Sequence, residues 1–282
     1  MQLKSLQKFF QNGLLGYYPK EEIDAFFYRI CEHHLSYKRI DVSLKSEALI
    51  TPETFEYFET AISRFLTYEP IQYILGSTSF FGLEFKVDAN VLIPRPETEE
   101  LVAWILKNTD SNYPLKILDI GTGSGCIAVS LAKQLPNAEV YALDVSPKAL
   151  EMTKFNAQQN AVQLNIIEAN VLGWNPTDLS FDIIVSNPPY VRESEKEQMA
   201  PNVLEHEPHL ALFVENNNPL IFYQAIVALS QQILKKQGKL YFEINEYLGD
   251  ETQALFSLDA FEALQLKADI FGKHRMVCAQ KR

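Results

Sequence analysis

The tetrapeptide Asn187-Pro188-Pro189-Tyr190 directly follows an apolar run, residues 181–186, that predicts a buried strand. Two consecutive prolines fix φ and exclude helix, so the backbone must leave the strand as an extended, rigid corner. Such a corner can hold the Asn187 side-chain oxygen and the Pro188 carbonyl as two acceptors facing one NH₂ group, with Tyr190 as a flat wall against a planar substrate. Accepting hydrogen bonds from both N–H groups orients a poorly nucleophilic amide or arylamine nitrogen and stabilises positive charge that develops on it. A turn without function is the alternative, because Asn-Pro and Pro-Pro are common turn formers.

A second candidate site is the segment Asp119-Ile-Gly-Thr-Gly-Ser-Gly125, between an apolar run (residues 116–120) and a helical pattern that begins at Cys126. Glycines at alternate positions allow a sharp turn and a close approach of the backbone to a ligand. The G-x-G-x-G spacing, without lysine, differs from both the dinucleotide fingerprint and the phosphate loop. A glycine loop alone is weak evidence, because a tight strand-to-helix turn also requires glycine. We expect a cofactor to contact the residues from the first to the last of these glycines: Gly121, Thr122, Gly123, Ser124 and Gly125.

Two further polar residues end predicted strands. Asp144 closes residues 139–144, where its carboxylate could accept hydrogen bonds from both ribose hydroxyls of a nucleoside or could cap the helix that opens at Ser146-Pro147. Asn170 and Val171 follow the next strand, where they could contact an adenine ring or form an ordinary loop. Together with the glycine loop, these positions favour a nucleoside pocket.

The elements that must position these residues alternate between strand and helix from Lys116 onward. This alternation predicts an α/β fold with a parallel sheet covered by helices on both faces. Ligands in that architecture bind at the carboxyl ends of the strands, near the topological switch point. The expected strands are residues 116–120, 139–144, 164–168, 181–186 and 238–245, with helices at 126–135 and 147–160.

The pattern before this sheet divides into two parts. Apolar residues recur three or four apart through residues 1–75, which predicts a small helical domain. Aromatic and β-branched alternation then predicts a β-hairpin linker over residues 76–95. Residues 96–282 form the expected catalytic domain, whose first helix begins with a proline and clustered acids.

Composition limits the possible partners. The 282 residues carry a formal net charge of −11, which argues against sequence-independent binding to nucleic acid. Three distant cysteines suggest neither disulfides nor a metal site, and a reducing cytoplasm fits. There is no continuous apolar run long enough to span a membrane. Glu205-His206-Glu207-Pro208-His209 is interpreted as a solvated loop and not a metal site, because its proline breaks any helix that would align the ligands.

Beyond these inferences, the set D-x-G-x-G-x-G, Asp144 and Asn170 resembles the Rossmann-like class I methyltransferases that use S-adenosylmethionine. The Asn-Pro-Pro-Tyr sequence resembles the signature of methyltransferases that act on planar NH₂ groups of adenine, cytosine or glutamine. Four segments extend the likeness over nearly the whole chain and resemble the release factor glutamine methyltransferases, the PrmC or HemK family. They read EPIQYILGSTSFFGLEFKVDANVLIPRPETEELV, DIGTGSGCIAVSLA, ALDVSPKALEMTKFNA and VSNPPYV.

The resemblance implies that the helical domain and the catalytic domain together grip a class 1 peptide release factor. It implies methylation of N5 of the glutamine in that factor's Gly-Gly-Gln loop. By position it places the cofactor on residues 121–125, Asp144, Val171 and Asn187, and the substrate glutamine on residues 187–190. Arg95 and Glu97 belong to a linker motif, Arg-Pro-Glu-Thr, that is expected to border the pocket. At Asn170-Val171 some relatives carry Asp-Trp.

Two other functions stay open: a nucleic-acid adenine methyltransferase with the same tetrapeptide, and a non-catalytic adaptor whose nucleotide pocket is vestigial. Residues 192–218 are long enough for a mobile lid. Residues 269–277 are interpreted as a turn between two final strands, with His274 and Arg275 as exposed turn residues without chemistry.

Overall fold

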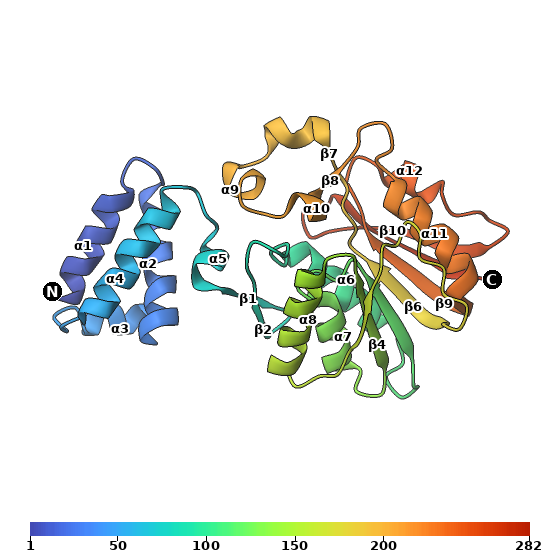
Figure 1. Ribbon diagram of the computed structural model, residues 1–282, viewed down its shortest axis with the longest axis horizontal. Coiled ribbons are helices and arrows are strands. Elements are labelled where there is room, and N and C mark those ends of the chain that lie inside the picture. Colours follow the sequence, from blue (N-terminus) through green and yellow to red (C-terminus); the bar gives the residue numbers. More distant parts are fainter. The chain divides into compact units, whose positions relative to one another are not determined.

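The computed structural model describes residues 1–282, which separate into two compact units (Figure 1). The first unit consists of Met1–Gly76 together with Ala200–His206, and the second of Ser77–Met199 together with Glu207–Arg282. The hairpin after Gly76 therefore belongs to the larger unit, and a short segment distant in sequence clusters with the smaller one. No helix is long and apolar enough to cross a membrane.

The first unit is helical, and α1 packs against α2 and α4. The apolar positions spaced three and four apart fall on one face of each long helix, as in Phe10, whose ring meets Phe58 and Phe65 edge-on. Thr51 caps α4 by accepting a hydrogen bond from the Thr54 amide. The helices are α1 (Leu3–Leu14), α2 (Lys20–Leu35), α3 (Arg39–Leu44), α4 (Pro52–Phe65), α5 (Ile71–Leu75) and the short α9 (Pro201–Leu204).

The second unit begins with the predicted hairpin, in which β1 (Ser77–Phe80) pairs antiparallel with β2 (Leu83–Lys86). Buried Asn156 holds this hairpin: its side-chain oxygen accepts from the Lys86 amide at 2.7 Å, and its NH₂ group donates to the Lys86 carbonyl at 3.0 Å. The same NH₂ group donates to the Ser124 carbonyl at 2.8 Å. One side chain therefore fixes the linker to the glycine loop.

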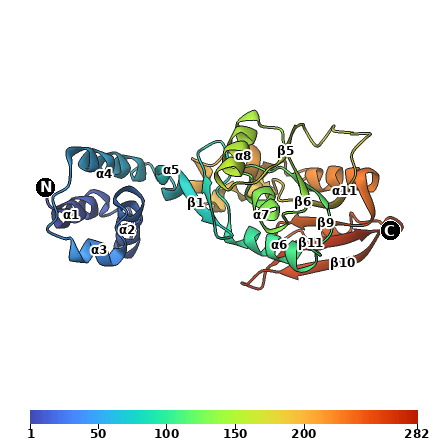
Figure 2. The same ribbon diagram turned by 90° about the horizontal axis from the view of Figure 1, so that it is seen from below.

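A seven-stranded sheet has the order β10-β11-β9-β6-β3-β4-β5. The pairs β9–β6, β6–β3, β3–β4 and β4–β5 are parallel, whereas β11 is antiparallel to both of its neighbours. Figure 2 shows β10 and β11 at one edge. The strands are β3 (Lys116–Ile120), β4 (Glu139–Asp144), β5 (Asn165–Glu168), β6 (Phe181–Ser186), β9 (Leu234–Glu243), β10 (Phe261–Ala268) and β11 (His274–Lys281).

Helices cover both faces of this sheet, as the alternation predicted (Figure 1). Leu101 of α6 and Leu131 of α7 lie in the core of one face, whereas Tyr223 and Ile226 of α11 lie in the core of the other. The prediction of an α/β fold with a mostly parallel sheet is therefore confirmed. The helices are α6 (Pro96–Lys107), α7 (Cys126–Gln134), α8 (Pro147–Gln159), α11 (Ile221–Ile233) and α12 (Gly249–Gln253).

The segment after the tetrapeptide folds into short elements that pair β7 with β8 in parallel. The interpretation of residues 205–209 as a solvated loop was wrong for Glu207, which is only 3% exposed, whereas Glu205 and His209 are exposed. The Glu207 carboxylate accepts from the Arg95 guanidinium and from the Ile93 amide, so burial of the charge is compensated. The short elements are β7 (Val191–Arg192), a 3₁₀ helix η1 (Glu193–Gln198), α10 (His209–Leu212) and β8 (Phe213–Val214).

Candidate active site

The glycine loop leaves β3 with positive φ at each glycine: 72° at Gly121, 56° at Gly123 and 81° at Gly125. A Cβ atom added at Gly125 would lie 2.9 Å from Cγ2 of Thr153, so this glycine permits close packing of the loop on α8. Added Cβ atoms at Gly121 and Gly123 would meet no atom within 4 Å. These two positions therefore expose their backbone to open space.

Asp119 stabilises the loop from beneath. It is fully buried, and its Oδ2 accepts hydrogen bonds from Thr122 Oγ1 at 2.6 Å and from the Ala128 amide at 3.2 Å. Burial raises the pKa of this carboxyl group to about 7. Its other oxygen, Oδ1, is buried without a hydrogen-bond partner in the protein.

Asp144 at the end of β4 holds both the glycine loop and the segment that leads into α8. Its Oδ2 accepts from the Gly123 amide and its Oδ1 from the Ser146 amide, both at 2.9 Å. Ser146 itself caps α8 by accepting from the Ala149 amide. Each carboxylate oxygen has more than one lone pair, so Asp144 keeps acceptor capacity toward a ligand while it fixes the loop.

These residues border a cavity of about 410 Å³ at the carboxyl ends of the parallel strands, within the usual size of small-molecule sites. Asp144 is the only charged residue in its lining, and the remainder is mostly apolar. The lining comes from the linker (Ala89, Asn90, Val91, Leu92), the first three strand ends (Ile120, Gly121, Gly123, Leu143, Asp144, Val145, Ser146, Ala149, Ala169, Asn170, Val171, Leu172), the tetrapeptide (Ser186, Asn187, Pro188, Pro189) and later segments (Pro208, Leu210, Ala211, Phe222, Ile226).

The tetrapeptide reaches this cavity because β6 runs parallel to β3 with Ser186 beside Ile120. The Ser186 hydroxyl donates to the Ile120 carbonyl at 2.7 Å, which ties the two strand ends together. Asn187 is half-buried, and its Nδ2 lies 3.3 Å from Thr98 Oγ1, to which it donates. Asn187 and both prolines therefore open onto the same space as the glycine loop.

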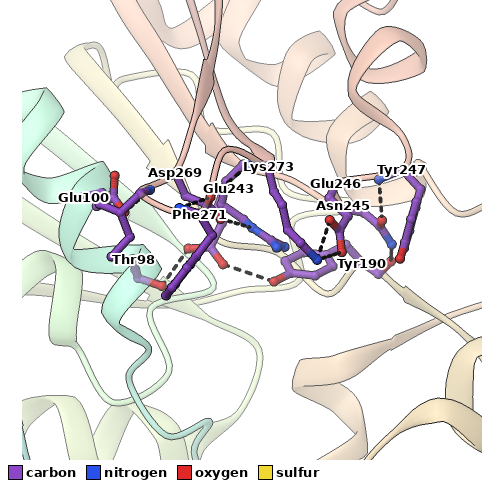
Figure 3. Close-up of polar contacts among 12 residues, drawn as sticks. Thr98, Glu100, Tyr190, Glu243, Asn245, Glu246, Tyr247, Asp269, Phe271 and Lys273 are labelled. Atoms are coloured by element: carbon purple, nitrogen blue, oxygen red, sulfur yellow. Dashed lines mark hydrogen bonds and ion pairs between the residues drawn. The ribbon is translucent and has the colours of Figure 1, made fainter.

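A buried carboxylate lies behind the tetrapeptide (Figure 3). Glu243, at the end of β9, accepts from Thr98 Oγ1 at 2.6 Å and from the Tyr190 hydroxyl at 3.1 Å. Burial is the largest influence on Glu243 and raises its pKa, while the two hydrogen bonds and the charge of Arg275 oppose that shift. Asn245 Nδ2 donates to the Tyr190 carbonyl at 3.1 Å, so the corner is held by backbone and side-chain contacts together.

Comparison with known proteins agrees with this geometry. Residues 99–211 match the methyltransferase small domain, and residues 8–76 match the PrmC N-terminal domain. The chain is 50% identical to a release factor glutamine methyltransferase of Flavobacterium psychrophilum over 98% of each chain. It is 40% identical to one of Bacteroides thetaiotaomicron over 99% of this chain and 100% of that one. The chain belongs to the release factor glutamine methyltransferase family.

Solved structures support the fold of this family member. A methyltransferase of Pyrococcus furiosus superposes with a TM-score of 0.53 and 18% identity, over 79% of this chain and 98% of that one. A 16S rRNA N2 G1207 methyltransferase of Thermus thermophilus, solved with AdoMet and guanosine, gives a TM-score of 0.51 at 18% identity, over 73% and 50% of the two chains. At this identity the likeness concerns the class I methyltransferase fold alone.

The structure places most of the predicted site residues around the cavity of this methyltransferase. The other six do not line it. Thr122 and Ser124 are buried members of the loop itself, Gly125 packs on α8, and the Tyr190 hydroxyl donates to Glu243. Arg95 pairs with Glu207. Neither Arg95 nor Glu97 lines the cavity. No group of three or more His, Cys, Asp or Glu side chains is placed to hold a metal ion.

Sequence reasoning missed Glu243 and the role of Thr98, and it misjudged Arg275. The interpretation of Arg275 as an exposed turn residue was wrong: it lies on β11 with its side chain largely buried, and it pairs with Asp269. His274 is exposed, as expected. A signal for Glu243 was present, because a lone carboxylate in the apolar run Leu-Tyr-Phe-Glu-Ile must find polar partners when the strand is buried.

Proposed function

We propose that this methyltransferase transfers a methyl group from S-adenosylmethionine to the side-chain amide nitrogen of the glutamine in the Gly-Gly-Gln loop of class 1 peptide release factors. The main support for the proposal is that the predicted substrate site and the predicted cofactor site line one cavity. The acceptor-bearing corner Asn187-Pro188 and the glycine loop with Asp144 line the same space. The names of two similar relatives, both release factor glutamine methyltransferases, support the choice of substrate.

The residues around the cavity fit the proposed cofactor. S-adenosylmethionine supplies, when bound, a methyl group on a positively charged sulfur. A cavity that contains one carboxylate and no lysine or arginine suits a cationic nucleoside without phosphates. Gly121, Gly123 and Asp144 would hold its polar groups, and Asn170 with Val171 would border its base. Asn170 Oδ1 already accepts from the Leu172 amide, which leaves its NH₂ group as the available donor.

The chain's own contribution to the reaction is orientation and charge stabilisation. Asn187 Oδ1 and the Pro188 carbonyl would accept the two N–H bonds of the glutamine amide, whose nitrogen lone pair is delocalised and poorly nucleophilic. As the nitrogen attacks, it becomes positively charged, and two fixed acceptors on its hydrogens stabilise that charge. The proton then leaves to water. The proline corner keeps the acceptors in place without a reorganisation cost.

The proposal assigns a separate role to each unit. The helical unit, residues 1–75 in the predicted division, would recognise the release factor. The hairpin of residues 76–95 would link it to the catalytic residues 96–282. The net charge of −11 favours a basic protein partner over a nucleic acid. Because the proposed substrate acts on the ribosome, we propose a cytoplasmic location for the enzyme.

Mass spectrometry of a purified release factor tests the proposal after incubation with enzyme and S-adenosylmethionine. We expect one added methyl group on the loop glutamine. Asn187→Ala should abolish most of that product while cofactor binding, measured by calorimetry, weakens but persists. An unmodified release factor together with labelled methyl groups on DNA or RNA adenine would favour the nucleic-acid alternative. Absence of any cofactor binding would favour a non-catalytic adaptor.

A further inference from the structure

The carboxylate of Glu243 dictates the direction of the hydrogen bonds behind the tetrapeptide. An ionised carboxylate only accepts hydrogen bonds, so both of its partners must donate to it. Thr98 does so to Oε2 and Tyr190 to Oε1 (Figure 3). Glu243 is 2% exposed, so water cannot supply alternative donors freely.

The direction of the Thr98 hydrogen bond determines the orientation of the Asn187 carboxamide. The single hydroxyl proton of Thr98 is committed to Glu243 at 2.6 Å, so only its lone pairs remain to face Asn187 at 3.3 Å. The group of Asn187 that faces Thr98 must therefore be its NH₂. Its Oδ1 accepts no hydrogen bond within the protein, and Asn187 lines the cavity. The hydrogen bonds from Asn187 to Thr98 and from Thr98 to Glu243 thus leave Asn187 Oδ1, an acceptor and not a donor, facing any ligand in the cavity.

We propose that Glu243 is a positioning residue that fixes, through Thr98, which end of the Asn187 carboxamide faces the substrate. Its second oxygen fixes the opposite end of the tetrapeptide through Tyr190. This inference rests on the proposed function and deepens it, because the acceptor polarity selects a substrate that offers N–H bonds. A glutamine side chain satisfies that requirement, and the isosteric glutamate carboxylate does not.

The surroundings keep Glu243 suited to this role. Burial raises the pKa of Glu243, and the guanidinium of Arg275, which Asp269 holds at 3.4 Å, opposes that shift and favours the ionised form. Tyr190 is further tied by the Asn245 side chain to its backbone carbonyl. A protonated or neutral side chain at position 243 would offer a donor of its own, and Thr98 could then donate to Asn187 and reverse the carboxamide.

Paired variants test the proposal. Thr98→Ser keeps the hydroxyl, whereas Thr98→Val removes it at nearly constant shape. We expect kcat for release-factor methylation to stay within about threefold of wild type in Thr98→Ser and to fall about ten- to a hundredfold in Thr98→Val, the cost of one misdirected buried hydrogen bond. Glu243→Gln should fall similarly. Calorimetric affinity for S-adenosylmethionine should change by less than about threefold in all three. Thr252→Val is the control, because that buried hydroxyl bonds only to its own helix at Leu248.

A second readout separates hydrogen-bond direction from general loss of packing. A release factor with glutamate in place of the loop glutamine should compete weakly with the wild-type enzyme. In Glu243→Gln, where Thr98 can donate to Asn187, the ratio of its inhibition constant to the KM of the native factor should fall by about tenfold, because the reversed carboxamide now donates. In Thr98→Val the carboxamide has no partner that orients it, so the ratio should also fall, but by less. A merely loosened site would weaken both ligands alike and leave the ratio unchanged.

The outcomes are distinguishable. If the wild-type enzyme does not methylate the release factor, the proposed function fails. If it does, but Thr98→Val matches Thr98→Ser in kcat, or the glutamate discrimination of Glu243→Gln equals that of wild type, the positioning role of Glu243 is refuted while the proposed function stands.

Discussion

Alanine substitutions at three glycines should distinguish the effects of backbone strain, of steric overlap and of a methyl group placed in the ligand cavity. Gly82 in the β1–β2 turn has φ 74° and free space around its missing Cβ, so Gly82→Ala should cost only the strain of a left-handed residue, about 1–2 kcal/mol. Gly125→Ala adds the 2.9 Å contact with Thr153, for a total of about 2–5 kcal/mol. Gly121→Ala should cost about as much stability as Gly82→Ala, because its added methyl group enters open space.

That methyl group, however, enters the cavity that we assign to the cofactor. Gly121→Ala should therefore weaken S-adenosylmethionine binding by at least about tenfold, a loss on the order of 1.4 kcal/mol. Gly82→Ala should leave the affinity unchanged. Thermal melting, at about 2–4 °C per kcal/mol for a chain of this size, and calorimetry measure the two quantities. A Gly121→Ala variant with wild-type affinity, or a Gly125→Ala variant as stable as Gly82→Ala, would refute the reasoning.

Three further predictions concern individual carboxylates. Asp144→Asn should lower cofactor affinity about tenfold, because it replaces one of two acceptors at the strand end and disturbs the bond to the Gly123 amide; unchanged calorimetric binding would contradict this. Burial raises the pKa of Glu243, so the folded protein binds this proton more tightly than the unfolded chain does. The protonated side chain therefore contributes to stability below its unfolded pKa, and this contribution is lost as pH rises through the folded pKa. At pH 8, Glu243→Gln should therefore melt no lower than wild type, although it is less active. The wild-type kcat should fall at acid pH with a pKa above the ordinary glutamate range, and this fall should disappear in Glu243→Gln. A lower melting temperature of Glu243→Gln at pH 8 would contradict this prediction. Glu207→Ala should lower the free energy of unfolding by about 2 kcal/mol and speed proteolysis within residues 192–218, because Arg95 and the Ile93 amide lose their partner. If residues 192–218 act as a lid, cofactor should slow this cleavage in wild type. A cleavage rate that changes neither with Glu207→Ala nor with cofactor would contradict the prediction.

The strand ends could be predicted because they depend on local signals. Glycines at alternate positions and two consecutive prolines each exclude regular structure, so Gly121 and Pro188 mark loops whatever the rest of the fold does. The alternation of apolar runs and helical patterns then places both loops at the carboxyl edge of one sheet. The structure confirms this arrangement through the pairing of Ile120 with Ser186.

Pairings between distant residues could not be predicted in this way. Arg95 meets Glu207 and Thr98 meets Glu243 across separations of more than a hundred residues, and nothing local in the sequence links the partners. Periodicity identifies a buried strand around Glu243 but not the donors that make its burial tolerable. Arg275 was misjudged for the same reason, because a turn pattern ends close to it while its side chain points back toward Asp269.

A crystal structure with S-adenosylhomocysteine and a Gly-Gly-Gln peptide tests the central claim most directly. The account predicts ribose hydroxyls within hydrogen-bond distance of Asp144, and the glutamine amide nitrogen within hydrogen-bond distance of Asn187 Oδ1 and the Pro188 carbonyl. A nucleoside bound elsewhere, or a glutamine that meets neither acceptor, would contradict it.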